Sequence, residues 1–221
     1  PVAGASAAEK IDDLRSGDDV ERRRAALALG EERPEEAVLD AVIAATNDPD
    51  DDVRQFAVES LAELGGERAA AAVVETLADE DPWVRAEAVV ALDNIDRIEF
   101  EDRIEAALSD DHHAVRRNAA ISLFKHRGED LLPVLLEQSR TDSERLREWA
   151  AHLMAGIDDE RATERLTELA EDDDEPQVVR STAARAVEAD PGKFRRQFTG
   201  GIEGESTALP GEDRLNRRPD L

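Results

Sequence analysis

The stretch Asp81-Pro82-Trp83-Val84-Arg85-Ala86-Glu87-Ala88-Val89-Val90-Ala91-Leu92 decides the fold. Its aspartate and proline favour a helix start. The aspartate carboxylate can accept hydrogen bonds from the amides of the first turn, and the N–H that proline lacks would have no partner within the helix at that position. Val84, Ala88, Val89 and Leu92 then fall on one side of a helix with a period of 3.6 residues. The stretch therefore predicts a capped helix with a single apolar stripe.

The pattern of this stretch recurs six times along the chain, at intervals of 31 to 33 residues. The residues equivalent to Val84 are Glu21, Val53, Val84, Val115, Leu146 and Val179. An arginine follows each of these anchors, an alanine lies four residues after it and an apolar residue lies eight after it. The alanine predicts close approach of a neighbouring helix. Residues with short polar side chains lie three before four anchors and predict N-caps: Asp18, Asp50, Asp81 and Ser143.

A second set of apolar segments lies between these helices. They are Ala7–Leu14, Glu35–Ala45, Arg68–Ala78, Phe100–Leu108, Leu131–Gln138 and Arg161–Ala170. Each repeat is therefore predicted to be an outer helix, a short acidic turn and an inner helix. One such pair cannot bury its apolar face alone, so neighbouring pairs must stack.

The repeated pattern Asp-x-x-Val-Arg-x-x-Ala-(Ala/Val)-x-x-Leu resembles HEAT repeats of the short, phycocyanobilin-lyase-like type, over residues 5 to 189. The resemblance implies an all-α, right-handed α-solenoid of six helix-pair repeats whose inner helices line the concave face. It also implies that the arginine after each anchor forms a ladder between repeats with the acidic turn residues Asp52, Asp81 and Asp111. Residues 1–189 are thus predicted to form the solenoid.

The pattern stops after Ala189, and glycines and prolines become frequent. We predict that residues 190–221 form an extended polar tail that packs on the solenoid or on a partner. Within it, Phe194, Phe198 and Ile202 are spaced by four, a spacing that would anchor a short amphipathic turn against the last repeat.

The chain of 221 residues carries 54 acidic and 28 basic residues, a formal net charge of -26, and only three of the basic residues are lysine. This acidic, lysine-poor composition resembles proteins of extreme halophiles, and it argues against nucleic acid because phosphate binding needs a basic face. The absence of cysteine excludes disulfides, thiolate metal sites and a cysteine nucleophile. No apolar run is long enough to span a bilayer and no signal peptide is visible, which predicts a cytoplasmic protein; an additional segment before Pro1 stays open.

No catalytic constellation is visible, and we expect neither enzymatic activity nor a cofactor. The four histidines lack metal-ligand spacing, and His112 and His113 are interpreted as surface or capping residues. The acidic runs Asp48–Asp52 and Glu171–Glu175 are interpreted as solvated turns, because they lack the central glycine and terminal glutamate of a calcium loop. The sequence therefore predicts no metal site.

Surface recognition remains as the main hypothesis: a non-catalytic scaffold, a subunit or assembly factor, that binds another protein through the solvent-facing side of its inner helices and through its tail. Aromatic, apolar and polar residues suited to such a groove are Phe56, Trp83, Val90, Arg117, Asn118, Ile121, Trp149 and His152. One alternative is a lyase-like or cofactor-maturation role, by analogy with tetrapyrrole lyases of this repeat type. A weaker alternative is nucleic-acid binding, for which the inner helices offer only Arg24, Arg117, Lys125 and Arg185.

Overall fold

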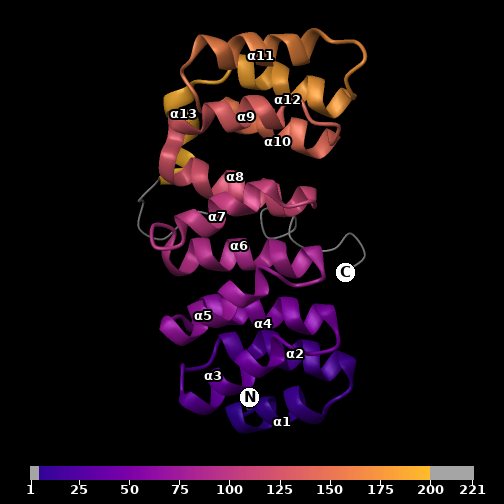
Figure 1. The fold of residues 1–221 in the computed structure, drawn as a ribbon, viewed down its shortest axis with the longest axis vertical. Coiled ribbons are helices and arrows are strands. Elements are labelled where there is room, and N and C mark those ends of the chain that lie inside the picture. The colour runs from indigo at the N-terminus through magenta and orange to yellow at the C-terminus, as the bar shows by residue number, and fades with distance from the viewer. Residues whose placement is uncertain (1–4, 200–221) are drawn as a thin grey trace. The chain divides into compact units, whose positions relative to one another are not determined.

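The computed structural model describes residues 5–199, with side chains through residue 196, and these residues contain helices and no strand. The chain divides into two compact units, residues 1–107 and residues 108–221 (Figure 1). Within each unit, helices that are far apart in sequence stack in the order of the repeats. The predicted all-α class is confirmed.

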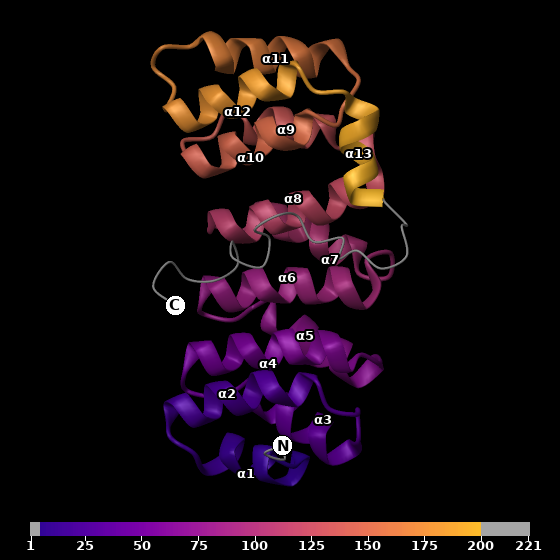
Figure 2. The ribbon, with the colours of Figure 1, turned by 180° about the vertical axis from the view of Figure 1, so that it is seen from behind.

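The first unit contains three complete helix pairs. Its outer helices are α1 (Ala7–Ser16), α3 (Glu36–Ala45) and α5 (Glu67–Thr76), and its inner helices are α2 (Asp19–Gly30), α4 (Asp51–Leu64) and α6 (Pro82–Asp96). Each inner helix packs on the next, α2 on α4 and α4 on α6, while α3 packs on both α1 and α5 (Figures 1 and 2). The short helix α7 (Glu101–Ala106) packs against α6, and the 3₁₀ turn η1 (Ala107–Ser109) follows it.

The second unit continues the alternation. Its inner helices are α8 (His113–Arg127), α10 (Glu144–Met154) and α12 (Gln177–Val187), and its outer elements are η2 (Gly128–Leu131), α9 (Leu132–Gln138) and α11 (Glu160–Glu171). Helix α10 packs on both α8 and α12, and α9 packs on α11. Helix α13 (Pro191–Thr199) follows the last pair.

The local rules read from the sequence are confirmed at the helix starts. The side chains of Asp18, Asp50, Asp81 and Ser143 each accept a hydrogen bond from a first-turn amide. His112 caps α8 by accepting from the amide of Ala114. These residues recur at the helix starts because a short side-chain acceptor satisfies first-turn amides that have no partner within the helix.

The alanines four residues after each anchor are all buried, as close packing of neighbouring helices requires. The apolar residues eight after the anchors are buried in the first five repeats, whereas Val187, at the end of α12, is 41% exposed. Helix α4 shows how far burial extends: besides its apolar stripe it buries Arg54, Gln55 and Ser60. An inner helix is covered by its outer helices and by inner helices on two sides, so more than one stripe is removed from water.

The predicted arginine ladder is present, but with other carboxylates than the predicted ones. Arg54 donates through Nε and Nη2 to Asp79 at 2.9 Å each, and through Nη1 to the Asp48 carbonyl at 3.0 Å. Arg22 pairs in the same way with Asp48, and Arg147 pairs with Glu175. Each bridge joins an inner helix to the turn that precedes the next inner helix.

The expectation for Asp52 and Asp81 is corrected accordingly. Asp81 caps α6, and Asp52 pairs with Arg23 at 3.2 Å. Before α4 and α6 the ladder acid stands two residues before the cap and also accepts from the amide of the cap residue, as Asp48 does from Asp50 at 2.9 Å and Asp79 does from Asp81 at 2.8 Å. The sequence signal for the ladder is thus Asp-x-Asp in the turns before α4 and α6, whereas a glutamate supplies the carboxylate before α12.

The beginning of the predicted extended tail is helical, because α13 spans Pro191–Thr199. Phe194 is buried, which agrees with the expected amphipathic turn, whereas the side chain of Phe198 and all of residues 200–221 lie outside the described residues. In the described part of the chain, every helix is too short or too polar to cross a bilayer.

Candidate protein-binding surface

The first unit presents apolar side chains at equivalent places on its three inner helices. Leu27 on α2 is 40% exposed, and Phe56 on α4 and Val90 on α6 are half-buried. Leu27 and Val90 occupy the same repeat position, six residues after their anchors, whereas Phe56 lies three after its anchor; positions three and six residues after an anchor fall on the same side of a helix. We call these three residues the inner row. Trp83, also predicted, is half-buried at the start of α6.

Polar side chains next to the inner row are held in place by contacts between repeats. Gln55 on α4 donates through Nε2 to Glu87 Oε2 on α6 at 3.3 Å, and both residues are buried. A second exposed apolar residue on α2 is Val20. Neither Val20 nor Leu27 is among the residues that the sequence predicted for the site, because only the packed structure separates covered from uncovered positions.

The second unit holds the other five predicted residues, and three of them are not solvent-facing. Arg117, Asn118 and Ile121 on α8 are only 3%, 6% and 4% exposed, so the prediction of an open row was wrong there. Arg117 donates through Nε and Nη2 to Asn118 Oδ1 at 3.1 and 2.9 Å. Its guanidinium carbon lies 5.7 Å from the ring centroid of Trp149 on α10, a cation–π distance. A helical-wheel assignment cannot see this cover by the next repeat.

Trp149 and His152 are half-buried and belong to a line of aromatic rings across the second unit. The Trp149 and His152 centroids are 5.4 Å apart, His152 and Phe194 are 5.1 Å apart, and Phe194 and Phe124 are 6.3 Å apart, with tilts near the edge-to-face arrangement that aromatic pairs prefer. The line joins α8, α10 and α13. Burial, aided by the positive charge of Arg185, lowers the pKa of His152, which favours its neutral ring.

A cavity of about 370 Å³ lies beside this line. It is lined by Phe124, Lys125, His126, Arg127, Gly128, Glu129, Asp130 and Arg195. Its charged side chains include both signs, and Arg195 forms an ion pair with Glu129.

The histidines at the start of α8 are structural. His112 caps the helix, and its ring centroid lies 4.4 Å from that of His113. Burial, followed by the nearby His112, Arg117 and Arg145, lowers the pKa of His113 to about 4. His113 is therefore neutral near pH 7. The predicted capping role is confirmed for His112, whereas His113 is half-buried.

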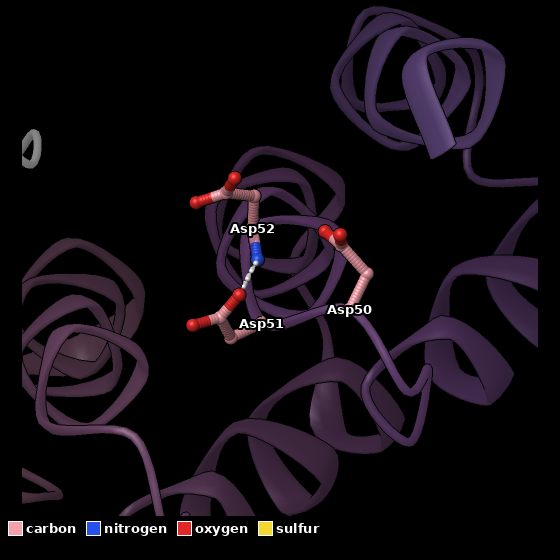
Figure 3. A group of neighbouring side chains, drawn as sticks. All are labelled: Asp50, Asp51 and Asp52. Carbon is pink, nitrogen blue, oxygen red and sulfur yellow. Dashed lines mark hydrogen bonds between the residues drawn. The ribbon is translucent and has the colours of Figure 1, made fainter. Parts of the chain in front are cut away.

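Three successive aspartates at the start of α4 have carboxylate oxygens within 4.8 Å of one another (Figure 3). Asp50 accepts two hydrogen bonds from Arg23 at 3.0 and 2.6 Å, which is the main reason that its pKa is lowered. Asp52 pairs with the same arginine, and Asp51 accepts from the Asp52 amide at 3.2 Å. The expectation of a solvated turn is wrong for Asp50 and Asp52, because Arg23 of the preceding repeat compensates their charge.

Among curated proteins, none matches this sequence. Solved structures with the same kind of fold include an archaeal HEAT-like repeats protein from Thermococcus onnurineus, 17% identical, covering 87% of each chain with a TM-score of 0.51. A designed armadillo repeat protein in complex with the peptide (KR)4 is 19% identical and covers 83% of this chain and 99% of that one, with a TM-score of 0.51. The complex of CpcE and CpcF of phycocyanin lyase from Nostoc sp. is 18% identical, covering 97% and 95%, with a TM-score of 0.43. At these identities the likeness concerns the fold alone.

The sequence matches the family described as HEAT repeats over residues 10–96 and again over residues 100–188. These two matches cover most of the chain and include all six anchors. They agree with the stacked helix pairs, the buried alanines and the arginine ladder described above. The chain therefore belongs to the HEAT-repeat family.

Proposed function

We propose that this HEAT-repeat chain is a non-catalytic scaffold that binds another protein, with the inner row of the first unit as its main contact. The observation that supports this proposal is the recurrence of accessible apolar side chains at Leu27, Phe56 and Val90. A single exposed leucine is ordinary on a protein surface. Three apolar residues on the same side of three packed inner helices are a recurrent feature that solvation alone does not require.

The surroundings of the inner row favour a partner with basic residues at the rim of its contact. Glu59 lies one repeat away from Leu27 at the equivalent position of α4, and the whole chain carries a formal charge of -26. Opposite charge at the rim accelerates association and excludes like-charged competitors more than it adds affinity. We further propose that the acidic composition adapts the chain to high salt, where the Debye length falls to about 3 Å at 1 M.

Affinity purification from the native host at its native salt concentration tests the scaffold function. The wild-type chain is compared with a Leu27→Ser/Phe56→Ala variant and with Ile98→Ser. Ile98 is the matched control because it is 70% exposed and lies in the turn after α6, outside the inner helices. We expect the wild type and the control to recover the same partner, and the double variant to recover about tenfold less, as loss of interface anchors does.

Circular dichroism at the same salt concentration must show equal helicity for all three proteins. Full recovery of the partner by the folded double variant would refute the inner row as the contact. Ile121, a predicted contact, is unsuitable for such a test because it is buried, and a polar substitution there would unfold the second unit.

A further inference from the structure

Among the side chains of α13 that the structure describes, residues 191–196, the buried one is Phe194. Phe194 is 9% exposed, whereas Lys193 and Arg196 are exposed. The Phe194 ring lies against Phe124 of α8 and His152 of α10. The described part of α13 therefore inserts a single aromatic anchor between two successive inner helices.

The place that receives this ring is shaped for it. Gly156 follows α10, and a Cβ atom there would lie 2.7 Å from Phe124 Cζ and 2.7 Å from Phe194 Cδ1, closer than atoms pack. Any residue larger than glycine would displace the ring. We call Phe124, His152 and Gly156 the aromatic seat.

The chemistry of the helix in the seat is opposite to that of the remaining chain. Residues 191–199 contain three basic residues and no acidic residue, in a protein with 54 acidic residues. Arg195 pairs with Glu129, beside the seat. The seat thus accepts a helix that combines a phenylalanine with neighbouring positive charge.

Helix α13 is too short to be stable without its contacts on the second unit. A nine-residue helix is marginal by itself in water, so its docking depends on the anchor and on its covalent attachment after α12. Because the short segment 188–190 tethers α13 to α12, the effective concentration of α13 at the seat is high. The helix can therefore dock with a smaller contact area than a separate molecule would need. A helix from another protein with further contacts would compete successfully. Trp149, half-buried and in edge contact with His152, is an adjacent surface for them.

We propose that the aromatic seat binds a basic helix of a partner protein that carries a phenylalanine anchor, and that α13 occupies the seat as an internal competitor. The proposal rests on the proposed scaffold function and adds to it a second contact site, its partner chemistry and its regulation. Binding at the seat requires release of α13, so the partner's affinity is lowered by the fraction of chain in which the seat is occupied.

The test uses the full-length chain and a fluorescein-labelled synthetic peptide of residues 188–199. Binding is followed by fluorescence anisotropy, with the emission of Trp149 as a second signal. In the Phe194→Ala chain the internal helix loses its anchor, and we expect the peptide to bind this chain about tenfold more tightly than the wild type. The same peptide with alanine in place of its anchor phenylalanine retains all charges, and we expect it to bind at least about tenfold more weakly.

A second variant keeps the test decisive. Gly156→Val in the Phe194→Ala chain fills the seat, and we expect it to abolish peptide binding while circular dichroism shows the helices intact. Equal binding of the two peptides would overturn the proposal, because charge alone would then explain it; so would equal binding to the wild-type and Phe194→Ala chains. A wild-type dimer in sedimentation velocity that Phe194→Ala dissociates would also overturn it, because the occupant would then be a second copy of α13.

The peptide assay contains no host partner, and the variants of the host purification leave the seat unchanged. If the peptide does not bind the seat but the inner-row variant loses the host partner as expected, only the proposal for the seat is refuted. If the peptide binds as expected but the inner-row variant recovers the host partner fully, only the inner row of the first unit is refuted as the contact.

Discussion

Replacement of Arg54 by alanine should destabilise the first unit strongly, because this arginine is one rung of the ladder that joins two repeats. The side chains of Arg54 and Asp79 are only 8% and 10% exposed, and two hydrogen bonds of 2.9 Å connect them. The hydrogen bonds to Asp79 are the main reason that the pKa of Arg54 is raised, so its charge is retained.

The magnitude follows from what the truncation leaves behind. Arg54→Ala removes three donors and leaves the Asp79 carboxylate and the Asp48 carbonyl without them. Removal of one partner from a buried ion pair costs about 3–5 kcal/mol. Asp79 keeps its bond from the Asp81 amide, so we expect the lower end of this range, about 3 kcal/mol.

Urea unfolding followed by circular dichroism and by the fluorescence of Trp83 measures the loss. The matched control is Arg68→Ala, because Arg68 also bridges two repeats, to Asp40 at 2.5 Å, but both side chains are about half exposed. We expect a much smaller effect for the control, since water replaces an exposed partner. A loss for Arg54→Ala no larger than that for Arg68→Ala would refute the ladder as a stabilising device. In a double-mutant cycle, the absence of coupling between Arg54→Ala and Asp79→Ala would refute it equally.

Three further predictions concern α13, pH and salt. Gly156→Val should detach α13 by displacing Phe194, and faster protease cleavage within residues 188–199 than in the wild type would show it; unchanged cleavage would contradict the seat geometry. Because folding lowers the pKa of His113 to about 4, the unfolded state binds more protons between pH 6.5 and 4, and stability should fall as pH is lowered through this window. The loss should be smaller in His113→Asn, and an NMR titration that shows this imidazole ionising near pH 6.5 would contradict its burial. With a net charge of -26, the melting temperature should rise from 0.1 M to about 1 M KCl as self-repulsion is screened, and a flat response would argue against the high-salt interpretation.

The repeat, its helix pairs and their caps could be predicted from the sequence because each depends on neighbouring residues. Asp81 and Pro82 start α6 through bonds and sterics within one turn, and the 3.6-residue period sets which side of the helix is apolar. The buried alanine row could be predicted as well, because close packing of neighbouring helices requires a small residue at that place in every copy. These features depend on residues within one repeat, and the same pattern occurs in six copies, which makes it recognisable in the sequence.

Only the tertiary structure decided which polar residues are covered and which partners they reach. Arg117 and Asn118 have the spacing of a solvent-facing row, yet both are buried, with Arg117 against Trp149 of the next inner helix. The ladder uses Asp79 and leaves Asp81 to cap α6, because the offset between successive inner helices sets which carboxylate an arginine can reach. Likewise Gly156 receives the Phe194 ring nearly 40 residues later in the chain, a pairing that no local rule contains. Sequence periodicity therefore determined the repeats, while contacts between elements determined which side chains are covered and which are left for the proposed binding sites.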